Sequence, residues 1–191
     1  SVWRVPEGAL EWDAPREDAS GAQAVAFSPD GIRLLVTGDA ETLRQYAWPA
    51  RTEERRLPAG ERNRSIAFHP DGCTFAVAAC CQGGSEVRFA DVASTAPGFR
   101  PDRVTEDCDH LSGLAFRGDG RWLAVPGREL SVFEYPSLRR AHRFDRNGDR
   151  IDAPPADATG VLDSAWTSAA FAGPGWVACA LGFLLRLLQH Q

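Results

Sequence analysis

The sequence predicts an all-β protein, and three observations support that prediction. Four segments end in the dipeptide Ala-Phe, at Phe27, Phe68, Phe116 and Phe171. Each is followed by a tight turn rich in Gly, Asp or Pro, the first of which is "SPDG". Each turn leads into an apolar run such as "RLLVTG", which is the pattern of a strand covered on both faces. The chain therefore repeats a strand–turn–strand unit.

Two further segments complete each repeat. The third mixes apolar and polar positions, as a partly covered strand does, and the fourth is charged, which protects an outermost strand from edge-to-edge pairing. The third segments are 42–49, 86–93, 129–136 and 183–190, and two clear fourth segments are 52–58 and 137–144. The Ala-Phe dipeptides recur at intervals of 41, 48 and 55 residues. Four antiparallel strands at this period predict a β-propeller of four-stranded blades, about four of which are visible.

The predicted organisation is a single propeller domain or propeller fragment over residues 1–191. Residues 1–6 fit a third strand and 9–15 a fourth, so 1–15 form the end of a preceding blade. There follow blades at 16–58, 59–103 and 104–144, a long loop at 145–166 and an incomplete blade at 167–191. One outer strand from the N-terminus suffices to close a ring, so residues 1–6 are surplus. We therefore expect part of a larger ring, and two alternatives stay open: a closed four-bladed ring, or two chains that form one ring.

The pattern "AFSPDG", "LLVTG" and "LRQY" resembles that of WD-repeat proteins, which are β-propellers. The resemblance covers almost the whole chain. The place of that family's Trp-Asp dipeptide is held by Trp3-Arg4, Tyr46-Ala47, Ala90-Asp91, Phe133-Glu134 and Leu188-Gln189, so no repeat contains Trp-Asp itself. The family's Gly-His dipeptide is also missing, although Asp39 lies in a suitable turn for its hydrogen-bond network. The resemblance implies a scaffold for protein interactions.

Composition narrows the class of partner. Apolar residues make up 43% of the chain, the formal net charge is −5 and the sequence pI is near 5.4, which argues against non-specific binding to nucleic acid or to anionic membranes. All 21 basic residues are Arg, which suggests GC-rich coding and a bacterial source. The five Cys form no Cys-x-x-Cys pair, so we expect reduced, structural thiols and a cytoplasmic location.

One segment could hold a metal ion. In "DRNGDRID", Asp145, Asn147, Asp149 and Asp152 are spaced as oxygen ligands are in a calcium loop. Arg150 stands where such loops need Gly, and the twelfth position is Ala156 instead of Glu. The alternative, which we favour, is an Asn-Gly hairpin tip. The segment "EDCDH" (106–110) fits a solvated polar loop better than a zinc site or a Cys–His pair.

Loops at one end of the blades are the predicted partner-binding region. The turns after each second strand (39–41, 82–85, 126–128) and the connections from fourth to first strands (16–22, 59–63, 104–111, 145–166) should share one ring face. The candidate contact residues there are Asp39, Glu41, Gln82, Arg128, His110 and Trp166.

The sequence contains no nucleophile elbow, zinc-protease motif or phosphate-binding glycine loop. We therefore expect a non-catalytic scaffold that binds a protein partner and no cofactor, with self-association through open blade faces as a further expectation. The alternative is a propeller enzyme, or a propeller that gates a hydrolase domain of a longer chain.

Overall fold

The computed structural model describes residues 1–4, 7–13, 21–38, 41–59, 63–81, 84–106, 111, 113–145, 147, 149–151, 166–171, 176–181 and 184–189. Every regular element in these ranges is a strand, which confirms the all-β prediction. The strands are β1 (Val2–Arg4), β2 (Ala9–Trp12), β3 (Ala22–Phe27), β4 (Arg33–Gly38), β5 (Thr42–Ala47), β6 (Thr52–Pro58), β7 (Asn63–Phe68), β8 (Thr74–Cys81), β9 (Gly84–Asp91), β10 (Arg103–Glu106), β11 (Ala115–Phe116), β12 (Trp122–Pro126), β13 (Leu130–Glu134), β14 (Arg139–Phe144), β15 (Trp166–Phe171), β16 (Trp176–Leu181) and β17 (Leu184–Gln189).

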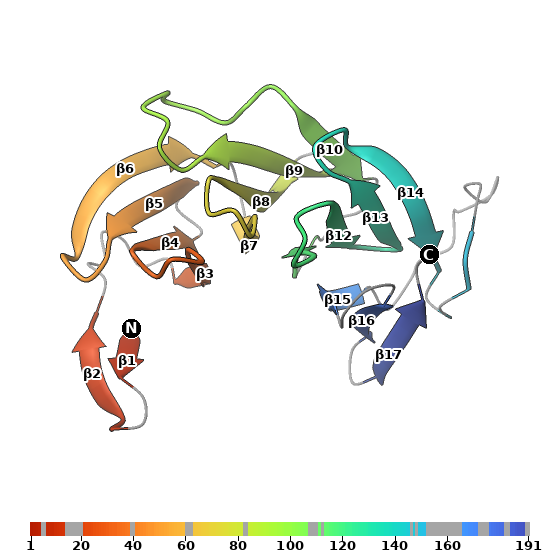
Figure 1. Cartoon of the computed structure of the whole chain (residues 1–191), viewed down its shortest axis with the longest axis horizontal. Coiled ribbons are helices and arrows are strands. Elements are labelled where there is room, and N and C mark those ends of the chain that lie inside the picture. The colour runs from red at the N-terminus through yellow and green to blue at the C-terminus, as the bar shows by residue number, and fades with distance from the viewer. Residues whose placement is uncertain are drawn as a thin grey trace.

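The strands form antiparallel sheets in which neighbours along the chain are neighbours in space. Blade 1 is β3–β6, blade 2 is β7–β10 and blade 3 is β11–β14, each with four strands. The terminal sheet has three strands, β15–β17, and β1 and β2 form a separate N-terminal hairpin. The sheets stand side by side in an arch, with the first strands toward its inner side and the fourth strands outside (Figure 1). This is the predicted partial propeller.

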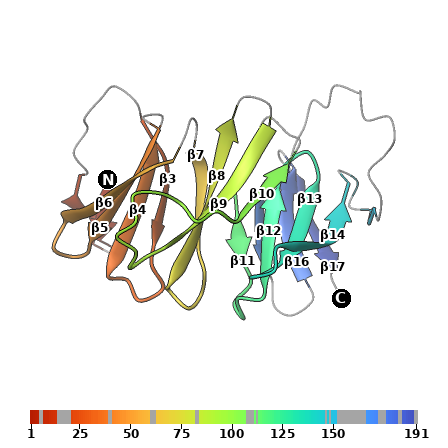
Figure 2. The same cartoon turned by 90° about the horizontal axis from the view of Figure 1, so that it is seen from above.

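The strand register repeats from sheet to sheet. The Phe of each Ala-Phe dipeptide pairs with the second residue of the following strand, in the pairs Phe27–Leu34, Phe68–Phe75, Phe116–Leu123 and Phe171–Val177. The Asp-Gly turns between these strands consequently lie together at one end of the blades (Figure 2). The sequence repeat is therefore a repeat of three-dimensional structure.

The apolar core lies between blades. Between blades 1 and 2, Leu35, Leu43 and Leu57 pack with Phe75 and Val77. A second cluster joins blades 2 and 3, and its members include Ala76, Val87, Phe89, Val104, Leu114, Leu123, Val125 and Phe133. Each blade thus presents one apolar face to the blade before it and another to the blade after it.

Three of the first-to-second-strand turns share one hydrogen-bond pattern. In blade 1 the Gly31 amide donates to the Ser28 carbonyl over 2.9 Å, and the Ile32 amide donates to Asp30 Oδ1 over 3.1 Å. Corresponding bonds fix the turns at 69–74 and 117–122. The Ser28 hydroxyl also donates to Asp30 Oδ1, which lowers the pKa of this carboxyl group.

Some observed strands cross the predicted boundaries between blades and loops. The fourth strand of blade 2 is β10, Arg103–Glu106, which pairs with β9. The predicted boundary between 103 and 104 therefore falls inside this strand, because the charged residues of the fourth strand continue into the connection. Of the long loop at 145–166, the structure describes 145, 147, 149–151 and Trp166, and Trp166 begins β15.

Among the described residues no helix is long and apolar enough to cross a membrane.

Two glycines allow the contact between turns to be tested. Gly31 and Gly120 occupy the same turn position with φ of +71° and +74°. A Cβ on Gly31 would meet nothing within 4 Å, whereas one on Gly120 would overlap the His69 ring of blade 2, with Cε1 at 2.6 Å.

We expect Gly31→Ala to lower the free energy of unfolding by about 1–2 kcal/mol, the cost of a left-handed backbone. Gly120→Ala should cost about 1–3 kcal/mol more, because it also overpacks the junction between blades 2 and 3. Urea unfolding of the two variants measures the difference. Equal losses would show that the His69 contact does not constrain the turn.

Candidate interaction surface

The blades have two ends with different chemistry. We call the end that carries the turns at 28–31, 69–72 and 117–120 the turn face, and the opposite end, with the predicted partner-binding loops, the loop face. The third-to-fourth-strand turns also lie on the turn face, because the Trp48, Val92 and Tyr135 amides donate to the residue before the second strand of the same blade (2.7–2.9 Å).

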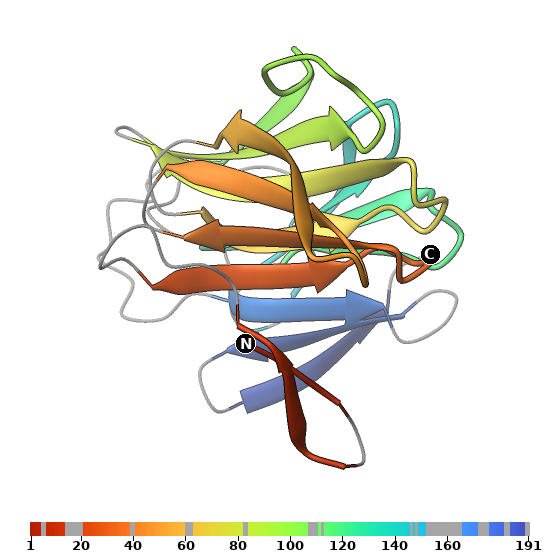
Figure 3. The same ribbon diagram turned by 90° about the vertical axis from the view of Figure 1, so that its left-hand side faces the viewer.

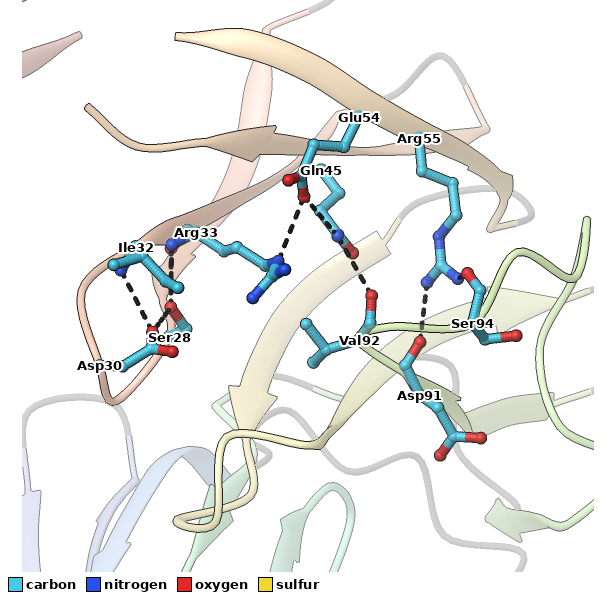
Figure 4. Close-up of polar contacts among 10 residues, drawn as sticks. All are labelled: Ser28, Asp30, Ile32, Arg33, Gln45, Glu54, Arg55, Asp91, Val92 and Ser94. Atoms are coloured by element: carbon cyan, nitrogen blue, oxygen red, sulfur yellow. Dashed lines mark hydrogen bonds and ion pairs between the residues drawn. The ribbon is translucent and has the colours of Figure 1, made fainter. Parts of the chain in front are cut away.

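On the turn face, polar side chains connect blade 1 to blade 2 (Figure 4). Gln45 on β5 is 3% exposed. Its Nε2 donates to the Val92 carbonyl of blade 2 over 3.2 Å and to Glu54 Oε2 over 2.8 Å. Arg33 Nε also donates to Glu54, over 3.2 Å. Gln45 therefore connects β5 to blade 2 through Val92 and to the outer strand of blade 1 through Glu54.

Arg55 makes the second connection of this junction. Its guanidinium donates to the backbone carbonyls of Ser94 and Asp91, the latter over 3.2 Å. Burial lowers the pKa of Arg55, and Asp91 and Glu54 act in the opposite direction. Because the acceptors are backbone atoms, these bonds depend on where the turn lies and not on its side chains.

His69 connects blade 2 to blade 3. Its Nε2 lies 2.9 Å from the Gly120 carbonyl and its Nδ1 lies 2.8 Å from Asp71 Oδ1. Its ring packs against Phe116 and Tyr135, with centroid distances of 5.1 and 5.0 Å. Burial would raise the pKa of Asp71, but the bond donated by the Cys73 amide and the adjacent His69 ring act in the opposite direction, and the net effect is to lower it.

The loop face carries buried charge instead. Arg140 Nη2 on β14 donates to Glu106 Oε1 on β10 over 3.1 Å, an ion pair between blades 3 and 2. Arg143 and Glu129 form a second pair within blade 3. The Glu106 side chain is 16% exposed, and burial raises its pKa although Arg140 acts in the opposite direction.

The predicted partner-binding residues fall partly within the described structure. Glu41 is exposed with φ of +56°, and its carbonyl accepts from the Ala59 amide over 2.7 Å at the end of β6. Arg128 is half-buried in the turn between β12 and β13. Trp166 begins β15 and pairs with Leu181. Asp39, Gln82 and His110 lie outside the described residues.

The candidate calcium ligands show the geometry of a turn. Asp145 Oδ1 accepts from the Asn147 and Asp149 amides over 2.8 and 2.9 Å, and Oδ2 accepts from Asn147 Nδ2 over 3.3 Å. The Asp145 amide in turn donates to the Asp149 carbonyl. These bonds form a turn around the Asp145 carboxylate, and Gly148 of the Asn-Gly pair lies outside the described residues. Asp152 lies outside the described residues, and in the part that is described no three His, Cys, Asp or Glu side chains gather as a metal site.

Gln45, Glu106 and His69 were not predicted as functional residues. His69 carries a sequence signal, because it replaces Ser28 at the first position of a repeated turn. Gln45 and Glu106 carry none that distinguishes them from other polar residues of third and fourth strands. Their roles depend on which neighbouring blade they meet.

Comparison with known proteins bears on the fold. A crystal structure of the WD40 repeats of RRP9 superposes on 86% of this chain with a TM-score of 0.68 and 13% sequence identity. This chain has the fold of a partial WD-repeat propeller. It spans about half, 46%, of the RRP9 chain. No known family profile matches the sequence, and no curated protein does.

Gln45→Leu tests the polar connection between blades 1 and 2. The substitution keeps an apolar side chain of similar size but leaves the Val92 carbonyl without this donor, so we expect a loss of about 1–3 kcal/mol in unfolding free energy. Thr95→Leu, at an exposed position of the same face, should change stability by less than about 0.5 kcal/mol. Equal effects in denaturant titrations would contradict a role for Gln45.

Glu106→Gln tests the buried charge on the loop face. With a raised pKa the folded chain holds a proton that the unfolded chain releases, so Glu106 makes stability fall as the pH rises from the ordinary value of 4.5 through the raised value. We expect the variant to lose this part of the pH dependence. Glu134→Gln, which interrupts the exposed Arg139 pair, is the control and should keep the part of the pH dependence that Glu106 contributes. Equal slopes for the parent and Glu106→Gln would refute the assignment.

Proposed function

We propose that this chain is a non-catalytic interaction module that binds a protein partner through its loop face. The observation that carries the proposal is that the turn face repeats one pattern from blade to blade, whereas the connections of the loop face differ. The polar side chains Gln45, Arg55 and His69 of the turn face are engaged in bonds between blades. The loop face bears the connections whose sequence and length vary from repeat to repeat.

A rigid scaffold suits binding because the blades themselves lose little conformational entropy when they meet a partner. Apolar packing and hydrogen bonds fix each blade against the next, so the loops start from fixed positions. Recognition in this proposal depends on shape and charge complementarity, with no bond chemistry. The acidic net charge of −5 favours a protein over nucleic acid as the partner.

The first strands support a binding role over a catalytic one. They lie toward the inner side of the arch, where a propeller enzyme would place its ligands (Figure 1). The sequences of β3, β7, β11 and β15 supply mainly Ala, Ser, Val and Phe. These residues offer few groups for acid–base or metal chemistry.

Arg128→Glu tests the loop face, with Arg121→Glu as the matched control because Arg121 lies exposed at the turn face. The parent chain and each variant are immobilised and exposed to an extract of the source cells. A protein that the parent chain retains is then purified, and its affinity for each chain is measured by titration. We expect at least one protein that the parent and Arg121→Glu retain and that Arg128→Glu binds at least tenfold more weakly, a loss of about 1.4 kcal/mol.

Two outcomes would overturn the proposal. One is that no protein binds the parent chain above an unrelated propeller used as a blank. The other is that Arg121→Glu weakens binding as much as Arg128→Glu does, which would place the contact elsewhere.

A further inference from the structure

The connection between the third and fourth strands of blade 2 is longer than its counterparts. It covers 92–102, whereas the corresponding connections of blades 1 and 3 cover 48–51 and 135–138. The green connection leaves β9, runs along the outer side of the arch toward β6 and returns to β10 (Figure 1), and it forms the loop at the top of Figure 3. We call residues 92–102 the strap. A connection of this length needs contacts of its own to stay in one position.

Blade 1 supplies the first set of these contacts. Val92 is 5% exposed and belongs to the apolar cluster between blades 1 and 2, and its carbonyl accepts the bond from Gln45 Nε2 (Figure 4). The Arg55 guanidinium donates to the Ser94 carbonyl. Near the other end of the strap, Phe99 packs on the same apolar cluster. The strap is therefore anchored in the junction between blades 1 and 2.

The residue after Phe99 contacts blade 3 instead. Arg100 Nη1 donates to the Tyr135 hydroxyl over 3.2 Å, and Tyr135 packs on the apolar cluster between blades 2 and 3. The Arg100 amide donates to the Phe89 carbonyl over 2.7 Å. Both carboxylate oxygens of Asp102 hold the guanidinium, with its Nε at 2.9 Å and its Nη2 at 2.8 Å. Arg100 is thus a fixed second anchor, in the other junction.

Asp91, the last residue of β9, lies between the two anchors. Its carbonyl accepts from Arg55 of blade 1 over 3.2 Å, and its carboxylate lies 3.5 Å from Arg100 Nη1. The Asp91 side chain is 54% exposed, so solvent screens this ion pair and the backbone of the strap makes the main connection. Blades 1 and 3 are thereby connected through one segment of blade 2.

We propose that the strap is a conformational coupling device, through which the junction between blades 1 and 2 and the junction between blades 2 and 3 tighten or loosen together. In a repeat protein each unit contacts only its neighbours, and the stabilities of separate junctions then add. The strap departs from this rule because one loop bonds to the blade before its own and to the blade after it.

The coupling arises from conformational entropy. Without the Arg55 bonds the strap has more freedom, and the bond between Arg100 and Tyr135 has to restrict that freedom whenever it forms. Restricting a backbone costs free energy, so each anchor is weaker when the other is lost. The effect is reciprocal, as any coupling between two sites is. A change at blade 3 should therefore be measurable at blade 1.

Tyr135→Phe tests the coupling from blade 3 to blade 1. The variant removes the hydroxyl group that accepts the Arg100 bond and keeps the ring that packs on Phe89. The marker is the Gln45 side-chain amide, which donates to Val92 at the other junction, and NMR measures its hydrogen exchange. We expect this exchange to become at least ~3-fold faster, because a freed strap opens that bond more often.

Arg140→Gln is the matched control. It removes a bond between blades 2 and 3 at the loop face, away from the strap, so the Gln45 exchange rate should stay at its parental value. Circular dichroism verifies that both variants are folded, and Tyr135→Phe differs from the parent chain by a single oxygen atom.

A double-variant cycle tests the same coupling through stability. Arg55→Gln removes the bonds from blade 1, and a chain with both Arg55→Gln and Tyr135→Phe lacks both anchors. Independent junctions would multiply the two increases in the unfolding equilibrium constant. We expect the combined increase in urea titrations to fall at least ~3-fold short of that product, because the first variant has already weakened the second contact. Arg55→Gln combined with Arg140→Gln should give the product within about twofold.

Three outcomes would overturn the proposal. They are an unchanged Gln45 exchange rate in Tyr135→Phe, an equal acceleration by Arg140→Gln, and a combined effect of Arg55→Gln and Tyr135→Phe equal to the product. If Arg55→Gln does not fold, the exchange rates in Tyr135→Phe and Arg140→Gln decide the question alone. The test does not involve partner binding, since the strap lies on the turn face and each readout uses the isolated chain.

Discussion

The structure depends on one constraint: a blade cannot bury its own apolar faces. Leu35 and Leu43 are inaccessible to solvent because Phe75, Val77 and the first strand of blade 2 lie against them, and Val87 and Phe89 depend on blade 3 in the same way. The hydrophobic effect therefore acts mainly between sheets and makes each blade a condition for the stability of its neighbours. Val25 and Phe27, which no blade among the described residues covers, are exposed.

Polar contacts give this packing its register. Apolar surfaces alone would tolerate a slide of one sheet over the next, whereas Gln45 and His69 each reach a backbone carbonyl of the following blade. The Gly120 carbonyl lies in a turn that the Asp119 side chain and a glycine shape, and the Val92 carbonyl lies in the turn between the third and fourth strands of blade 2. These turn-face bonds act together with the Arg140–Glu106 pair on the loop face to align neighbouring blades.

The absence of the Trp-Asp dipeptide is compensated locally. Its position is held by Tyr46, Ala90 and Phe133, all of which are buried. Blades 1 and 3 add an aromatic side chain two residues later, Trp48 and Tyr135, that packs on the Phe of the first strand. Aromatic packing and the bonds of Gln45, Arg55 and His69 thus hold the described blades together.

The sequence by itself determined the strands and their order. The Ala-Phe dipeptides, the Asp-Gly turns and the apolar second strands are local signals, because a turn needs its glycine and a covered strand needs its apolar run. Only the tertiary structure decided which polar residues connect one blade to the next. Gln45 and Glu106 look like other polar residues in the sequence, and His69 differs only by its place in a repeated turn. The approach of a second blade gives all three their partners, and burial raises the pKa of Glu106. Likewise Phe27 and Phe68 share one motif, and Phe68 is half-buried because it packs on the cluster that contains Leu35 and Leu43 of blade 1. Contacts between residues far apart in sequence depend on the arrangement of whole sheets, which no local pattern encodes.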